Sequence, residues 1–215
     1  MRRPPELILA SASPRRRELL EGLGLVLAVE PVDIDEAVRA GEAARAYACR
    51  LAAEKCDAAV ARLGAPVLPV LAADTVVTLG GEILGKPDGE EQAAAMLRRL
   101  AGHRHEVLTA YRVRYGERVV ERAVSTFVSF RSLDDREVAA YLACGEWRGK
   151  AGAYAIQGIA GSFVTDVRGS FTNVVGLPLA EVLADLRALE ALPGYPPPAF
   201  GAASEATPRL SSKPG

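Results

Sequence analysis

The chain has 215 residues and a formal net charge of −1, from 26 basic and 27 acidic side chains. Hydrophobic residues make up 49% and charged residues 25%, which is typical of a globular protein and excludes a disordered or collagen-like chain. The near-neutral charge argues against a general nucleic-acid binder, so we predict no nucleic-acid partner.

The cysteines and the N-terminal residues indicate a cytoplasmic protein. Cys49, Cys56 and Cys144 form an odd, sparse set, which is typical of reduced thiols. The apolar run at residues 7–10 is too short for the core of a signal peptide. No apolar run approaches the length of roughly 18 residues that a membrane-spanning helix needs, so we predict no membrane partner.

Strands alternate with helices along most of the chain. We expect strands at residues 7–10, 25–29 and 67–79, and helices from Pro14 to Gly22 or Gly24 and at residues 42–63, 89–100, 134–143 and 174–189. Gly80-Gly81 and Gly116-Glu117 predict antiparallel hairpins, the second within residues 105–131. The Gly-rich residues 150–170 predict short strands. This order predicts an α/β fold, and the long hairpin predicts a mixed sheet.

The C-terminal residues differ from the rest in composition. Residues 193–215 contain six prolines and three glycines. We therefore predict one domain over residues 1–192 and a poorly structured Pro/Gly-rich tail over residues 193–215 that carries no chemistry.

Lysine is rare in this chain. It has 22 arginines but only four lysines, at positions 55, 86, 150 and 213. An ammonium is compact and rotatable whereas a guanidinium is a rigid fork, so a lysine kept in such a chain indicates a position that needs the ammonium.

The segment Ser11-Ala12-Ser13-Pro14-Arg15-Arg16 joins the first strand to the first helix. Free N–H groups and the positive dipole end make a helix N-terminus a good anion site. The dipole disfavours cations in the first turn by roughly 0.3–1 kcal/mol, and a bound anion would compensate for Arg15 and Arg16. We predict phosphate binding here; two solvated arginines are the alternative.

Asp74 lies in the middle of an apolar strand, within Ala72-Ala73-Asp74-Thr75. A carboxylate at such a place is costly unless it is paired, binds a metal or is catalytic. The alternative is a structural aspartate that accepts hydrogen bonds from neighbouring backbone.

Three further segments place polar groups beside turns or on a helix: Gly85-Lys86-Pro87, the Gly-rich residues 149–158, and Glu54-Lys55. Glycines let backbone approach a ligand closely. Each segment alone also fits a plain turn or a solvated helix face, and the phosphate loop GxxxxGK[ST] is absent.

The two histidines do not form a zinc signature. His103 and His105 share a strand face, but no cysteine or carboxylate lies at a suitable spacing, so we predict structural roles. The motifs GxSxG, HExxH and CxxC are absent, which leaves a serine triad or a helix-bound zinc without support.

Five motifs follow one another between about residues 6 and 190. They are Ser11-x-Ser-Pro-Arg-Arg, Ala-Asp74-Thr, Gly85-Lys86-Pro, Lys150-Ala-Gly-Ala-Tyr-x-Ile-Gln157-Gly and Asn173-Val-Val-Gly-Leu-Pro-Leu. Together they resemble the Maf family of nucleoside triphosphate pyrophosphatases. The resemblance implies hydrolysis of a nucleoside triphosphate to the monophosphate and pyrophosphate, a divalent cation (Mg²⁺ or Mn²⁺), and often a homodimer. It also implies an elongated fold with two lobes around a cleft, related to inosine triphosphate pyrophosphatases.

The resemblance assigns roles to individual residues. Asp74 matches the catalytic proton acceptor. The other polar residues of the family's cleft are matched by Ser11, Arg15, Arg16, Glu36, Lys55, Lys86 and Gln157, and base selection is matched by Arg15, Thr75 and Gln157. The Ala-Tyr-x-Ile-Gln form is similar to the branch that acts on dTTP and UTP, which points to nucleotide house-cleaning with a link to septum formation left open.

The residue types support this chemistry independently. Arg15, Arg16, Lys55 and Lys86 could balance a triphosphate and stabilise charge in the transition state. Asp74 and Glu36 could hold the metal or activate water, and sequence does not decide which does which. Two alternatives are a non-enzymatic regulator of division or of nucleic acid, and a family member that prefers a modified purine nucleotide.

Overall fold

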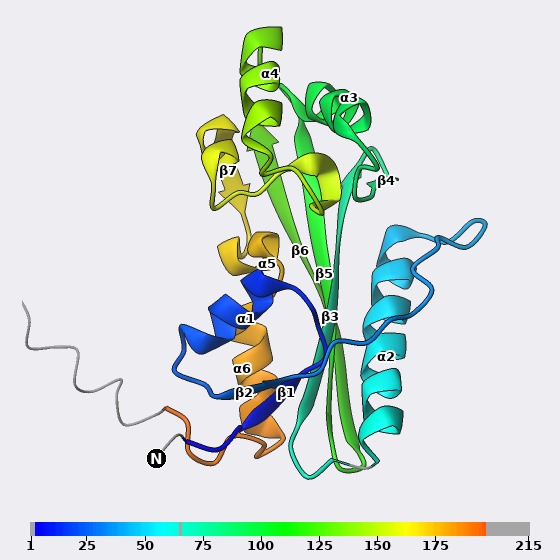
Figure 1. Cartoon of the computed structure of the whole chain (residues 1–215), viewed down its shortest axis with the longest axis vertical. Helices are drawn as coiled ribbons and strands as arrows, with labels where there is room; N and C mark the ends of the chain where they lie inside the picture. Colours follow the sequence, from blue (N-terminus) through cyan, green and yellow to red (C-terminus); the bar gives the residue numbers. More distant parts are fainter. Residues whose placement is uncertain (1–2, 65, 197–215) are drawn as a thin grey trace, which may run out of the picture.

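The computed structural model describes residues 3–64 and 66–196 and is elongated (Figure 1). One mixed sheet has the strand order β2-β1-β3-β5-β6-β7, with β4 paired to β3. The strands are β1 (Leu7–Leu9), β2 (Leu27–Val29), β3 (Val70–Leu79), β4 (Glu82–Leu84), β5 (Arg104–Tyr115), β6 (Arg118–Phe130) and β7 (Val164–Arg168). β1 runs parallel to β2 and β3, and the remaining pairs are antiparallel. The predicted α/β class and mixed sheet are confirmed.

Helices cover both faces of this sheet. They are α1 (Pro14–Glu21), α2 (Ala44–Leu63), α3 (Glu90–Leu100), α4 (Asp135–Cys144), α5 (Phe171–Val175) and α6 (Leu179–Ala188), with 3₁₀ turns η1 (Ala151–Ala153) and η2 (Ile159–Phe163). Figure 1 shows α2 on one face and α1, α5 and α6 on the other. Ala48 and Ala52 of α2 pack on Val76 of β3, whereas Leu71 packs with α1 and α6 on the opposite face.

The long strands β3, β5 and β6 run through two lobes with separate apolar clusters. One cluster lies among α3, α4 and the 3₁₀ turns, and the other among β1, α1 and α6. No helix in the described part of the chain is long and apolar enough to cross a membrane.

Glycines end several elements where sequence analysis placed them. Gly80 and Gly81 have φ of +60° and +87°, as the turn of the β3–β4 hairpin requires. α2 ends at Gly64, with φ +68°. Asp134 and Glu137 form a reciprocal capping box at the start of α4.

Three expectations about elements are wrong. The third strand begins at Val70 instead of residue 67, because Pro69 directly precedes it and Val67 is exposed. Most of residues 150–163 form 3₁₀ turns and loops, and β7 is the one strand in that Gly-rich region. The last helix is broken in two, since Gly176 has φ +131° and Pro178 lacks an N–H.

The chain after α6 still packs against the body at its first residues. Ala191 and Leu192 are buried, and Tyr195 packs against the apolar cluster that lies among β1, α1 and α6. The rest of the expected tail, residues 197–215, lies outside the described residues, so the domain boundary at residue 192 stays a prediction.

His105 is buried between aromatic rings, in keeping with a structural role. Its Nε2 lies 2.8 Å from the Tyr154 hydroxyl, and its ring contacts Phe130 edge-on. Burial lowers the pKa of His105 to about 4. The unfolded chain, with an ordinary histidine pKa of about 6.5, therefore binds a proton at a pH where the folded chain does not.

We expect stability to fall as the pH drops from 6.5 to 4, with His105 contributing about 3 kcal/mol of that loss. Urea unfolding of the wild type and of His105→Gln across this range tests the expectation. The variant should be less stable at pH 7 but show the shallower pH dependence. Parallel curves for the two proteins would contradict a neutral buried His105.

Candidate active site

An open stretch of the β3 edge marks the site. β1 pairs with β3 at Val70 and Leu71, and β4 pairs with it from Val77 onward, which leaves residues 72–76 between them. The chain leaves the carboxyl end of β1 here and turns into α1, and such ends of parallel strands are where α/β sheets bind ligands. A cavity of about 410 Å³ lies at this place.

Eight of the nine predicted site residues line this cavity: Ser11, Arg15, Arg16, Glu36, Lys55, Asp74, Thr75 and Lys86. They come from the β1–α1 turn, the first turn of α1, the β2–α2 loop, α2, β3 and the loop after β4. Gln157 is different, because it is exposed and is not among the lining residues.

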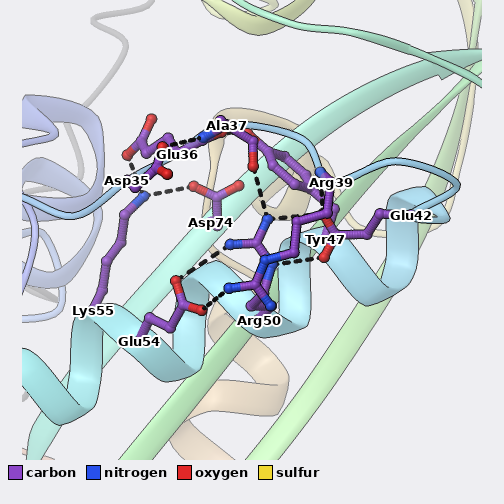
Figure 2. Close-up of polar contacts among 10 residues, drawn as sticks. All are labelled: Asp35, Glu36, Ala37, Arg39, Glu42, Tyr47, Arg50, Glu54, Lys55 and Asp74. Atoms are coloured by element: carbon purple, nitrogen blue, oxygen red, sulfur yellow. Dashed lines mark hydrogen bonds and ion pairs between the residues drawn. The ribbon is translucent and has the colours of Figure 1, made fainter.

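Asp74 faces α2 because side chains alternate along β3. It is 8% exposed, and Lys55 of α2 donates to its Oδ1 at 2.7 Å. The same ammonium lies 2.6 Å from Glu36 Oε1, so one lysine joins two carboxylates (Figure 2). Lys86 donates to the other oxygen of Glu36 at 3.0 Å. The result is an alternating chain of charges along the cavity wall.

Glu36 remains ionised in this arrangement. Partial burial raises its pKa, but hydrogen bonds and charge from Lys55 and Lys86 outweigh burial and lower the pKa to about 2. A carboxylate with two ammonium partners is available at neutral pH as a cation ligand.

Thr75 points to the opposite face, where Arg16 meets it. Arg16 donates from Nη2 to Thr75 Oγ1 at 3.0 Å, from Nη1 to Ser11 Oγ at 3.1 Å and from Nε to the Gly176 carbonyl at 2.8 Å. Burial is the main cause that lowers its pKa. The alternative of a solvated arginine is therefore wrong for Arg16, which ties the β1–α1 turn to β3 and to the break after α5.

The single asparagine of the chain, Asn173, is linked by hydrogen bonds to the Thr75 side of the site. Asn173 Nδ2 donates to the Val107 carbonyl at 3.0 Å and to Thr126 Oγ1 at 2.9 Å, and the Asn173 backbone carbonyl accepts from Thr109 Oγ1 at 3.0 Å. Thr109 in turn contacts Thr75 Oγ1 at 2.9 Å. In the sequence Asn173 stands out only as part of a motif, and its role in the structure is to hold neighbouring strands together.

Lys150 also lines the cavity, although it is not among the nine predicted site residues. Burial and the nearby charge of Arg15 lower its pKa. Burial likewise lowers the pKa of Arg15. Neither cation has a carboxylate within ion-pair distance in residues 3–64 and 66–196. Two neighbouring cations without counterions favour a bound anion. The rarity of lysine was the signal that could have found Lys150.

A glycine contact holds the loops of Lys86 and Lys150 together. The Gly152 amide donates to the Gly85 carbonyl at 3.1 Å. Gly152 has φ +67°, and a Cβ there would lie 3.0 Å from a methyl carbon of Val77. Only glycine fits this position without strain.

The cavity is cationic in a nearly neutral protein. Five basic side chains and two carboxylates line it, a surplus of three positive charges. No group of three or more histidine, cysteine or acidic side chains that could by itself hold a metal occurs in the part of the chain that the structure describes. The surplus of positive charge suits a polyanion.

Known proteins match nearly the whole described chain. A family model described as "Maf-like protein" matches residues 6–189. The chain belongs to the Maf family. A protein named dTTP/UTP pyrophosphatase from Cereibacter sphaeroides is 54% identical over 190 residues, covering 88% of this chain and 97% of that protein. One of the same name from Anaeromyxobacter dehalogenans is 54% identical over 187 residues, covering 85% of this chain and 93% of that protein.

More distant matches add little to the family assignment. A dTTP/UTP pyrophosphatase from Escherichia coli is 48% identical over 186 residues, 86% of this chain and 94% of its own. A solved dITP/XTP pyrophosphatase from Mycobacterium abscessus covers 94% of this chain and 99% of its own at 17% identity, with a TM-score of 0.40.

Proposed function

We propose that this Maf-family chain hydrolyses dTTP and UTP to the monophosphate and pyrophosphate. The observation that carries the proposal is the cavity, in which Asp74, Lys55, Glu36 and Lys86 alternate in charge. Beside them lie Arg15 and Lys150, which form no ion pair within the described residues. The names of relatives that are 54% identical over most of the chain support the substrate class.

In this proposal the basic side chains bind the phosphates and Asp74 activates water. A triphosphate carries about four negative charges. The cavity has a surplus of three positive charges, and one divalent cation raises the positive charge to five, enough to balance the triphosphate. Asp74 takes a proton from a water molecule while the water oxygen bonds to the α-phosphorus. The bond between the α-phosphorus and the pyrophosphate oxygen breaks. Lys86 and Arg15 stabilise the charge that grows on the departing oxygens.

The residues present fit a divalent cation that arrives with the substrate. Asp74 and Glu36 each place an oxygen within 2.7 Å of the Lys55 ammonium, so the two carboxylates are neighbours that can share a divalent cation beside Lys55. Mg²⁺ is usually bound by one or two carboxylates together with substrate phosphates. We propose that Asp74 and Glu36 hold Mg²⁺ or Mn²⁺, which when bound would neutralise phosphate charge.

The direct test is a panel of nucleoside triphosphates offered to purified protein with Mg²⁺ or Mn²⁺, with pyrophosphate measured. Release of pyrophosphate from any of these nucleotides supports the proposal that the chain is a pyrophosphatase. Absence of turnover on every member would sink the proposal and favour a non-enzymatic regulator. Best turnover of a modified purine nucleotide would favour the other alternative. A homodimer and a cytoplasmic location remain predictions.

On the same panel we expect kcat/KM for dTTP and UTP to exceed that for CTP, dATP and dGTP by about tenfold or more. A site that hydrogen-bonds the O4/N3–H edge leaves buried polar groups unpaired with the wrong base, at about 1–3 kcal/mol per group. Equal values for UTP and CTP would contradict this preference.

Gln157 is our predicted reader of that edge, since its amide offers both a donor and an acceptor. Its exposed position outside the cavity lining means that this role requires the side chain to turn inward when substrate binds. Gln157→Leu should narrow the discrimination between UTP and CTP while the melting temperature stays unchanged. An equal loss on every nucleotide would instead point to a role in tying down its loop.

Lys86→Arg is expected to lower kcat/KM by about tenfold or more, or about 1.4 kcal/mol. Its Nζ bonds one oxygen of Glu36 at 3.0 Å, and a planar fork cannot occupy that point contact without displacing the carboxylate. Arg98→Lys, in an exposed ion pair with Asp135 away from the cavity, is the control and should change little. Wild-type activity in Lys86→Arg would contradict the prediction that position 86 needs an ammonium, which is based on the rarity of lysine in the chain.

A further inference from the structure

The loop between β2 and α2, residues 30–43, contains no helix or strand, yet it carries Glu36 into the cavity. Fixing the backbone costs about 1–2 kcal/mol per residue. A precise place for Glu36 between Lys55 and Lys86 therefore requires contacts that hold this loop.

Two side chains of α2 supply such contacts at Glu36 and the next residue (Figure 2). Tyr47 donates its hydroxyl to the Glu36 carbonyl at 2.8 Å, and Arg50 Nη2 donates to the Ala37 carbonyl at 3.0 Å. Tyr47 and Arg50 are three residues apart and so share a helix face. The guanidinium carbon lies 5.5 Å from the centre of the Tyr47 ring.

Arg50 also contacts the loop at a second residue, Glu42. Its Nε and Nη2 donate to the two oxygens of Glu42 at 2.6 and 2.8 Å, and its Nη1 donates to Glu54 of α2 at 3.3 Å. The Arg50 side chain is only 13% exposed. A planar guanidinium can make these bonds together, whereas an ammonium cannot.

We propose that Arg50 is a positioning residue for the reaction: by fixing the loop at Ala37 and Glu42, it holds the Glu36 carboxylate between Lys55 and Lys86. Arg50 is not among the residues that line the cavity, so it acts through Glu36 and not on the substrate. The inference rests on the proposed function, in which Glu36 works beside Asp74.

The first test compares Arg50→Lys with Arg62→Lys. Arg62 is a matched control, because it also projects from α2 and bonds the same loop, at the Pro31 carbonyl and Glu30, both at 2.8 Å. We expect Arg50→Lys to lower kcat on the preferred nucleotide by about tenfold or more with KM within about threefold. Arg62→Lys should stay within about threefold of wild type in both constants. A wild-type kcat in Arg50→Lys, or an equal loss in Arg62→Lys, would overturn the proposal.

A double-mutant cycle separates positioning from general destabilisation. With Glu36→Gln already present, Arg50→Lys should cost less than about threefold further in kcat, because the group that it positions is gone. If Arg50→Lys costs the same factor in both backgrounds, it acts independently of Glu36 and the proposal is wrong.

Hydrogen exchange gives a readout that needs no turnover. In Arg50→Lys the amides of residues 35–38 should exchange faster while those of α2 stay protected. If the wild type hydrolyses no nucleoside triphosphate, the proposed function fails, and this measurement alone decides whether Arg50 orders the Glu36 segment. Unchanged exchange at residues 35–38 would overturn the positioning role.

Discussion

Asp74→Asn is expected to fold normally and to lose about 10²–10⁴ in kcat, the range typical of removing a general base. An asparagine keeps an oxygen that can accept the 2.7 Å hydrogen bond from Lys55, and β3 remains paired with β5 at this position. The variant therefore changes the proton affinity of the side chain with little change in its packing. Steady-state kinetics at saturating metal and substrate measure the loss.

Asp185→Asn is the matched control for Asp74→Asn. Asp185 is also a buried aspartate, but it lies on α6, where it accepts hydrogen bonds from Tyr111 at 2.6 Å and from Arg122 at 2.7 Å. Its replacement should cost about 1–3 kcal/mol of stability and leave kcat within about threefold of wild type. If Asp74→Asn behaved like Asp185→Asn, with lost stability and retained turnover, Asp74 would be a structural residue.

The fold was largely predictable because its strongest signals are local. Period-2 alternation placed the β5–β6 hairpin, and glycines with positive φ placed the ends of α2 and of the β3–β4 turn. The break between α5 and α6 was missed although Gly176 and Pro178 stand in the sequence. Its cause is partly tertiary, since the Gly176 carbonyl is turned toward Arg16, 160 residues away.

The site was predictable as a set of residues, and its connections were not. An aspartate in an apolar strand and lysines kept in an arginine-rich chain are signals that single residues can carry. That Lys55 joins Asp74 to Glu36, that Arg16 uses its donors on neutral oxygens, and that Arg50 reaches Ala37 depend on how distant segments pack. No local pattern in residues 30–43 marks Glu36 as the member of that acidic stretch that enters the cavity.

Lys55→Met is expected to lower kcat at neutral pH by about 10²-fold or more, or about 2.7 kcal/mol. Methionine keeps the apolar stem, but Asp74 and Glu36 lose the ammonium that lies within 2.7 Å of both. Asp74 then has no ammonium partner beside the neighbouring Glu36 carboxylate, which keeps only Lys86, and the repulsion between the two carboxylates raises the pKa of Asp74. Protons then compete with the divalent cation for these carboxylates, and when Asp74 is protonated it cannot accept a proton from water.

The pH profile distinguishes this mechanism from simple loss of a phosphate contact. Because the carboxylate pKa is raised, the rate of Lys55→Met should recover as the pH increases and fall more steeply than the wild-type rate as it decreases. Lys86→Met is the comparison, since Lys86 contacts Glu36 but its side chain is 60% exposed. Its profile should keep the wild-type shape with a smaller loss. If both variants lost rate by the same factor at every pH, Lys55 would serve only to bind phosphate, and the coupling of Asp74 to Glu36 through its ammonium would have no part in the chemistry.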